Sequence, residues 1–150
     1  MISYFGNILA DFNRMELAAM ILKKISLAAE SSDAPEYFKI TDNCLKGLNA
    51  GMDLSLVESW FLLNLAKTLG EEINLYRDAD GEKLQTGTQY SFMAAENALI
   101  RNPSGEYGED EIKIMRLMLV TELGTVARIK NIEKSLPAIL RFSRIINKMI

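Results

Sequence analysis

Carboxylates are the main residues in this chain that could carry out acid–base chemistry, because it contains no histidine. Histidine is the commonest general base and, with cysteine, the usual zinc ligand. Four acids gather at Glu106, Glu109, Asp110 and Glu111, and paired carboxylates can transfer protons. Acids in the first turn of a helix, however, already have a sufficient role in capping it. We therefore expect no catalytic residues and no enzyme activity.

Positive charge is concentrated at the C-terminal end. Residues 123–150 hold six basic residues and one acid, a net charge of +5, whereas residues 1–122 hold eleven basic residues and nineteen acids, a net charge of −8. On a helix, Arg141, Arg144 and Lys148 would lie within about 60° of one another. Such a basic strip suits phosphates or an acidic peptide, although a solvated helix face is an equally good interpretation. The candidate binding residues are Arg128, Lys130, Lys134, Arg141, Arg144 and Lys148.

The acidic turn around Gly81 is the other place where an ion could bind. Asp78, Asp80 and Glu82 could hold a hard cation, but their spacing does not match a calcium-binding loop, and a solvated turn is the better interpretation. One cysteine and no histidine cannot supply the four ligands of a structural zinc. We expect no metal and no cofactor. Apolar packing must then hold this segment, through Tyr76, Leu84, Tyr90, Phe92 and Ile100.

The elements that position these residues are mainly helices. Apolar residues recur every three or four positions in most of the chain, which predicts five or six helices around one core. Trp60 should be buried in one of them, with Asp53 as its N-cap, and Gly51 should end the helix before it. The expected helices cover about residues 4–29 (bent near Asn13), 35–49, 54–69, 109–119, 126–129 and 137–150. Gly124 should break the helix that begins at residue 109, before the short helix at 126–129. The expected strands are 73–76, 89–93 and 98–101. The fold class is mainly α, with a small irregular or β insert at about 71–108.

Length and composition limit the number of domains and the cellular compartment of the protein. With 150 residues, of which 49% are hydrophobic and 25% charged, the chain should form one domain with a real core. The chain contains no run of about eighteen uncharged apolar residues, so the sequence predicts no membrane span. It also lacks the basic region followed by an apolar run that is typical of a signal peptide. Cys44 is the only cysteine, which fits a reducing cytoplasm and a small buried side chain.

Several short motifs follow one another along the chain. The apolar helix Trp60–Gly70 ends in Leu-Gly, and Gly81-Glu-Lys-Leu84 and Tyr90-Ser-Phe92 follow in a ribbon-like insert. Ile132-Glu-Lys-Ser135 then precedes the basic terminal helix. In their order and spacing, these motifs resemble the C-terminal region of the recombination mediator RecO. Ile2-Ser-Tyr4-Phe5 is similar to the exit from the family's N-terminal OB domain. Two features depart from the family: no strand-rich stretch precedes Tyr4, so we expect no OB-fold in this chain, and the zinc cysteines are missing.

The resemblance implies non-catalytic work in bacterial DNA recombination and repair. RecO proteins bind single- and double-stranded DNA, the acidic, apolar-ended tail of single-stranded-DNA-binding protein, and the mediator RecR. In that scheme the helical domain chiefly contacts proteins, so we expect weak DNA binding by this domain alone. The alternative is a helical adaptor domain that binds protein and no nucleic acid. Clustered exposed cations in residues 123–150 would favour the mediator, whereas scattered or self-paired cations would favour the adaptor.

Overall fold

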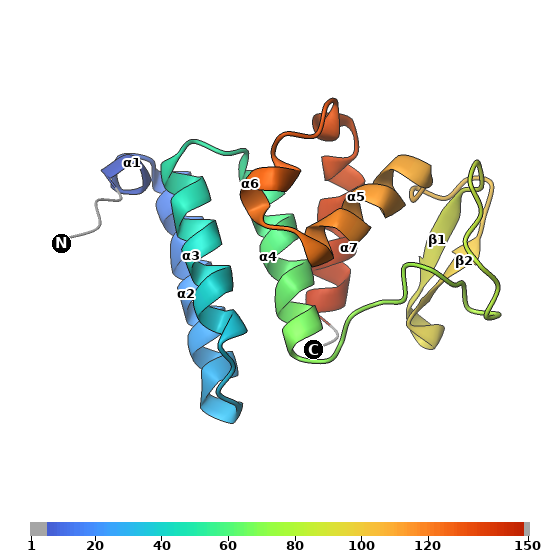
Figure 1. The fold of residues 1–150 in the computed structure, drawn as a ribbon, viewed down its shortest axis with the longest axis horizontal. Coiled ribbons are helices and arrows are strands. Elements are labelled where there is room, and N and C mark those ends of the chain that lie inside the picture. The colour runs from blue at the N-terminus through green and yellow to red at the C-terminus, as the bar shows by residue number, and fades with distance from the viewer. Residues whose placement is uncertain (1–5, 149–150) are drawn as a thin grey trace.

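Helices dominate the computed structural model, which describes residues 6–148 (Figure 1). A hairpin of two long helices lies at one end, a central group of helices follows, and a small antiparallel sheet lies at the other end. The expected fold class, mainly α with a small β insert, is confirmed. The elements are α1 (Gly6–Leu9), α2 (Phe12–Ser31), α3 (Glu36–Asn49), α4 (Leu54–Thr68), β1 (Tyr90–Met93), β2 (Ala98–Arg101), α5 (Glu109–Val120), α6 (Leu123–Val126) and α7 (Leu136–Lys148), with 3₁₀ turns at Ala94–Glu96 and Ile132–Lys134.

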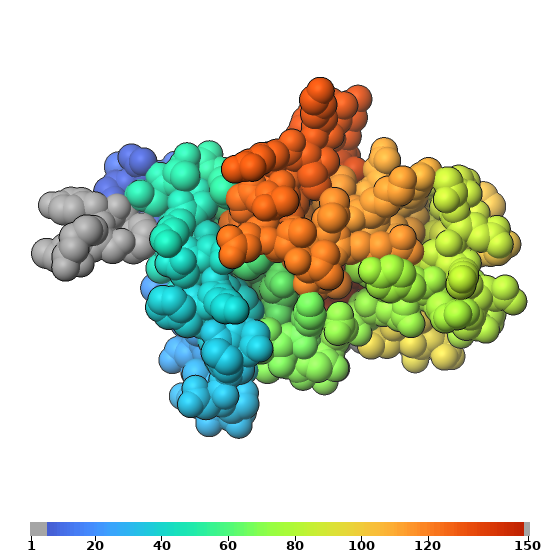
Figure 2. Space-filling model, viewed as in Figure 1, coloured from blue at the N-terminus to red at the C-terminus, as the bar shows by residue number. Residues whose placement is uncertain are grey.

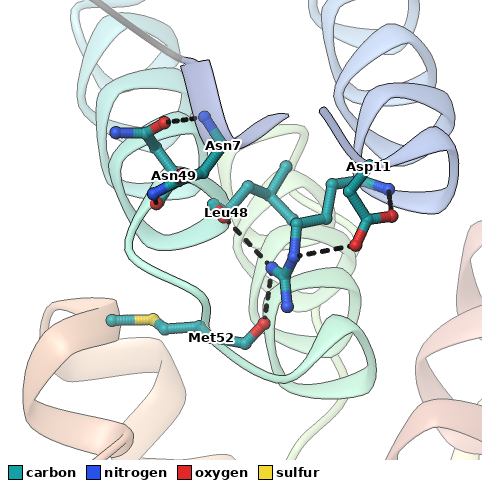
Figure 3. A network of polar contacts seen from close by, with 6 residues as sticks. Asn7, Asp11, Leu48, Asn49 and Met52 are labelled. Atoms are coloured by element: carbon teal, nitrogen blue, oxygen red, sulfur yellow. Dashed lines mark hydrogen bonds and ion pairs between the residues drawn. The ribbon is translucent and has the colours of Figure 1, made fainter. Parts of the chain in front are cut away.

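The first predicted helix is in fact two, separated at Asp11 and not merely bent near Asn13. Asp11 has extended backbone, and its carboxylate accepts a hydrogen bond from the Arg14 amide at 3.2 Å, so α2 begins anew there. The Arg14 guanidinium then donates to the carbonyls of Leu48 (3.1 Å) and Met52 (2.7 Å). The start of α2 is thereby tied to the end of α3 (Figure 3). The predicted start near residue 4 lies outside the described residues.

The boundaries of α3 and α4 agree with the sequence signals. Gly51 follows α3 with φ of +89°, in the left-handed region that glycine adopts without strain. The Asp53 carboxylate accepts from the amides of Ser55 (2.8 Å) and Leu56 (3.2 Å), which caps α4 as predicted. Asn49 also bonds to Asn7 of α1 through a side chain and a backbone group on each residue (Figure 3).

Helix α4 is the centre of the core, in contact with α2, α3, α5 and α7. Trp60 is 4% exposed, so its predicted burial is confirmed. Its indole N–H donates to the carbonyl of Thr121 at 3.1 Å, just beyond α5. Cys44 on α3 is also fully buried, and burial raises the pKa of its thiol. None of the described helices combines the length and apolar character needed to cross a membrane.

The insert forms one hairpin, with β1 antiparallel to β2 and Tyr90 opposite Arg101. The strand predicted at 73–76 is wrong. Its backbone turns instead, because the Asn74 side-chain oxygen accepts from the amides of Tyr76 (2.8 Å) and Arg77 (3.0 Å). Ile73 and Leu75 of this turn still have buried side chains.

The expected packing residues of the insert are partly right. Tyr90 is fully buried, and Leu84 and Phe92 pack against the core. Tyr76, however, is 60% exposed, with Arg116 stacked on its ring. Ile100 is only half-buried, because Leu99 is the residue of β2 that points into the core.

Aromatic contacts join the insert to the helices. The ring of Phe142 on α7 meets Phe92 and Tyr107 edge-to-face, with centroids 5.4 and 5.1 Å apart. Edge-to-face contact is a favourable geometry for aromatic pairs.

The segment after α5 differs from prediction. Helix α5 ends at Val120, before Gly124, because Thr121 is extended (φ −129°, ψ 164°). Gly124 lies inside α6, whose start is held by a hydrogen bond from the Leu123 amide to the Asn43 side chain at 3.2 Å. The helix expected at 126–129 is therefore shifted to 123–126. On α7 the apolar face is buried as expected at Ile139, Phe142 and Ile146, while Met149 lies outside the described residues.

Candidate interaction surface

The six candidate cations are all exposed, but they fall into two groups. Arg128, Lys130 and Lys134 belong to the segment that joins α6 to α7, which rises above the rest of the molecule in Figure 1. The other three lie along α7: Arg141, Arg144 and Lys148. The six candidate cations therefore do not form one continuous surface.

Both arginines of the basic strip are already paired with acids from distant elements. The Arg141 guanidinium donates to Glu106 in two hydrogen bonds, one of them 2.9 Å from Nε to Oε1. Arg144 binds Glu58 in a bidentate fashion, at 2.6 and 3.0 Å. The hydrogen bonds to these carboxylates raise the pKa of each arginine. The strip thus presents little unpaired positive charge.

Lys130 and Lys134 have a different setting. They line a hollow of about 490 Å³ beside α5, together with Lys113, Leu117 and Ile129 and with two acids, Asp110 and Glu111. The Glu111 carboxylate is taken up by hydrogen bonds from Gly108 and Ser135. Neither Lys130 nor Lys134 forms an ion pair with any residue that the structure describes, whereas Lys113 pairs with Glu109 at 2.8 Å. Two of the predicted cations are therefore placed next to apolar side chains.

A larger hollow, of about 720 Å³, lies on the other side of α5, between α3 and α4. Ile40, Trp60, Leu119 and Val120 contribute apolar surface to it, and Lys39 and Lys67 contribute positive charge. The Lys67 ammonium donates to the Leu119 carbonyl at 2.7 Å, where the last carbonyls of α5 carry partial negative charge.

An exposed apolar ridge on α5 borders both hollows, because Leu117 lines the smaller one and Val120 the larger one. Leu117 is 42% exposed and Val120 is 69% exposed, one turn apart on α5. We call the ridge and its flanking lysines the α5 surface; it comprises Leu117, Val120, Lys113, Lys130, Lys134, Lys39 and Lys67. Helix α5 lies on the face of the molecule seen in Figure 2.

This ridge was not identified from the sequence, because apolar residues lie on more than one face of α5. Ile112, Ile114, Met115 and Met118 form its buried face. At 100° per residue, Leu117 lies about 130° from the centre of that face and Val120 about 170°. A helical projection of residues 109–120 would have separated the two sets.

The acidic residues have structural roles. The Glu111 carboxylate accepts from the Gly108 amide at 2.9 Å and from the Ser135 hydroxyl at 2.6 Å, so its expected capping role is confirmed. Asp78 folds the acidic turn by accepting from the amides of Asp80 (2.9 Å) and Glu82 (3.0 Å). Within residues 6–148, no cluster of three or more His, Cys, Asp or Glu has the arrangement of a metal site.

Comparison with protein families gives one result. The model of the family described as "Recombination protein O C terminal" matches residues 9–147, which is nearly the whole chain. No curated protein and no solved structure matches the chain. The match includes all of α2 to β2 and α5 to α6, and all but the last residue of α7.

Proposed function

Because the chain belongs to the recombination protein O C-terminal family, a family of DNA recombination and repair, we propose that it is a non-catalytic mediator domain that works by binding partner proteins. Its first proposed partner is the C-terminal tail of single-stranded-DNA-binding protein, and a second is a RecR-like mediator. The absence of histidine and the structural roles of the acids support a non-catalytic role.

The α5 surface is the observation that carries this proposal. An acidic, apolar-ended peptide needs a place to bury its terminal side chain and cations to offset the desolvation of its carboxylates. Leu117 and Val120 offer exposed apolar area. The hollow that Leu117 lines carries the unpaired lysines Lys130 and Lys134, and the hollow that Val120 lines carries Lys39 and Lys67. Arg141 and Arg144 on α7 are less suited to this role, because both are already paired with carboxylates.

Titration calorimetry with a synthetic acidic peptide that ends in an apolar residue tests the proposal. The double substitution Lys130→Glu/Lys134→Glu should weaken binding at least about tenfold, or roughly 1.4 kcal/mol. Val120→Asp should have a similar effect, because it places a carboxylate where the apolar end must pack. Val120 is 69% exposed, so this change should leave the fold intact.

Matched controls separate a specific site from a general effect of charge. Lys83→Glu/Arg101→Glu makes the same change in net charge at two exposed basic residues of the insert. Leu27→Asp places the same carboxylate on α2, at a leucine that is 54% exposed. Neither should change peptide affinity by more than about twofold. Equal losses in the variants and the controls would contradict a site on α5.

We also propose weak DNA binding by this domain. Four candidate cations have no partner among the described ion pairs: Arg128, Lys130, Lys134 and Lys148. If each met one phosphate of a single strand, log K should fall with log salt with a slope no steeper than about −3, from about −0.7 per contact. Fluorescence anisotropy with labelled oligonucleotides measures this slope. Tight binding that persists at high salt would contradict the proposal.

The pairing of Arg141 and Arg144 supports the alternative of a helical adaptor that binds protein and no nucleic acid. The same two assays distinguish the functions. Peptide binding without measurable DNA binding favours the adaptor, whereas binding of both, with overlapping effects of Lys130→Glu/Lys134→Glu, favours the mediator.

A further inference from the structure

Helix α2 presents an apolar face that no other part of the described chain covers. Phe12 is 70% exposed, Met15 40% and Leu22 47%. Together with three small exposed residues they recur with alternating spacings of three and four, the pattern of residues that meet along a pair of packed helices. This outer face of α2 consists of Phe12, Met15, Ala19, Leu22, Ser26 and Ala29.

We propose that the outer face of α2 binds the same face of a second copy of this chain, with the two helices antiparallel about a two-fold axis. A two-fold interface requires a surface that is complementary to itself. The order of residue sizes along α2 and the positions of Glu16 and Lys23 each meet this requirement, in one and the same register.

Side-chain size fixes the register. If Ala19 of one copy faces Leu22 of the other, then Met15 faces Ser26 and Phe12 faces Ala29 of the other copy. Each large side chain thus meets a small one, and symmetry repeats every pair. A parallel arrangement would instead place Phe12 against Phe12 and Ala19 against Ala19, which crowds one level and leaves a gap at the next.

Charge supports the same register. Glu16 and Lys23 border the outer face of α2 on one side, one position after Met15 and Leu22, and both are exposed. In the antiparallel register, Glu16 of one copy lies about two residues along the axis from Lys23 of the other, or roughly 3 Å at 1.5 Å per residue. Two opposite-charge pairs, related by the two-fold axis, therefore lie along one edge of the interface. The described chain shows no ion pair for either residue within one copy.

The available area predicts a weak dimer. The fractional exposures of Phe12, Met15 and Leu22, together with the 70% exposed Leu9 of α1, correspond to roughly 400 Å² of apolar surface per copy. Two copies would bury roughly 800 Å² of this apolar surface, below the size of a stable interface and within the range of weak, transient ones. We therefore expect a reversible dimer that dissociates at micromolar concentrations of the chain.

Sedimentation equilibrium of the whole chain between 1 and 300 µM tests the proposal. The wild type should pass from monomer to dimer across this range, and Leu22→Glu should remain a monomer. Leu27→Glu is the matched control, because Leu27 is 54% exposed on the same helix but lies about 110° from the centre of the outer face. It should dimerise like the wild type. Circular dichroism should show equal helix content in all three proteins.

Reversal of charge tests the register itself. Glu16→Lys or Lys23→Glu alone converts both flanking pairs into like-charge pairs, and should weaken the dimer about tenfold. The double variant Glu16→Lys/Lys23→Glu restores opposite charges with their order exchanged, and should return to within about threefold of the wild type.

Three results would overturn the proposal. A wild type that is monomeric throughout the range would show that the outer face of α2 serves another occupant, such as a further domain or a different protein. A dimer that persists in Leu22→Glu would lie elsewhere on the molecule. A double charge variant as weak as the single variants would rule out the antiparallel register.

Discussion

Replacing Phe142 with alanine should release the insert from the helices, because Phe142 is the ring on which it packs. Phe142 is fully buried on α7 and meets both Phe92 and Tyr107 edge-to-face. Deletion of a buried Phe side chain costs about 3–5 kcal/mol, and each aromatic pair accounts for about 0.5–1.5 kcal/mol beyond buried area. A loss of this size should lower the thermal midpoint by about 6–20 °C for a chain of this length.

Urea denaturation followed by the fluorescence of Trp60, the only tryptophan, measures the free energy of unfolding. Phe38→Ala is the control, because it removes the same side chain at a position that is 76% exposed, and should change stability by less than about 0.5 kcal/mol. A double-mutant cycle with Phe92→Leu should give a coupling energy of about 0.5–1.5 kcal/mol. If Phe142→Ala costs no more than Phe38→Ala, packing on Phe142 does not hold the insert.

Three further predictions concern stability. The purified protein should contain no zinc by elemental analysis, and a chelator should leave its thermal midpoint unchanged, since one cysteine and no histidine cannot complete a structural site; one tightly bound zinc per chain would refute this. Burial, with a smaller effect of Glu106, raises the pKa of Tyr107 to about 12. The folded chain thus holds the phenol proton more tightly than the unfolded chain (pKa about 10), so this stabilisation is complete below pH 10 and is lost as pH rises towards 12. Urea titrations at pH 9 and 11 should show the loss, and Tyr107→Phe should reduce it. Gly105→Ala should destabilise the insert, because a Cβ would lie 2.1 Å from the Tyr90 carbonyl oxygen; an unchanged unfolding midpoint would contradict that contact.

The helices could be predicted because their signals are local. Asp53 begins α4 and Gly51 ends α3 through contacts within a few residues, and the apolar periodicity that buries Trp60 lies within one helix. The strand expected at 73–76 failed for a local reason that propensity does not capture, since the Asn74 side chain competes for the backbone amides that a strand would use.

The interaction surface could be predicted only in part, because it depends on contacts between distant residues. The sequence gives the charge of Arg141 and Arg144, but Glu106 and Glu58 lie 35 and 86 residues away, and their pairing follows from the fold. Lys130 and Lys134 were identified from charge alone. The hollow beside them forms only when α5 packs against the 129–135 segment.

Mapping by nuclear magnetic resonance would show whether the acidic, apolar-ended peptide binds to the α5 surface. Uniformly ¹⁵N-labelled protein would be titrated with this peptide, and amide chemical shifts recorded. The largest changes are expected at Leu117, Val120, Lys130 and Lys134, with little change along α2. Changes confined to Arg141 and Arg144 on α7, or no change at saturating peptide, would contradict binding at the α5 surface.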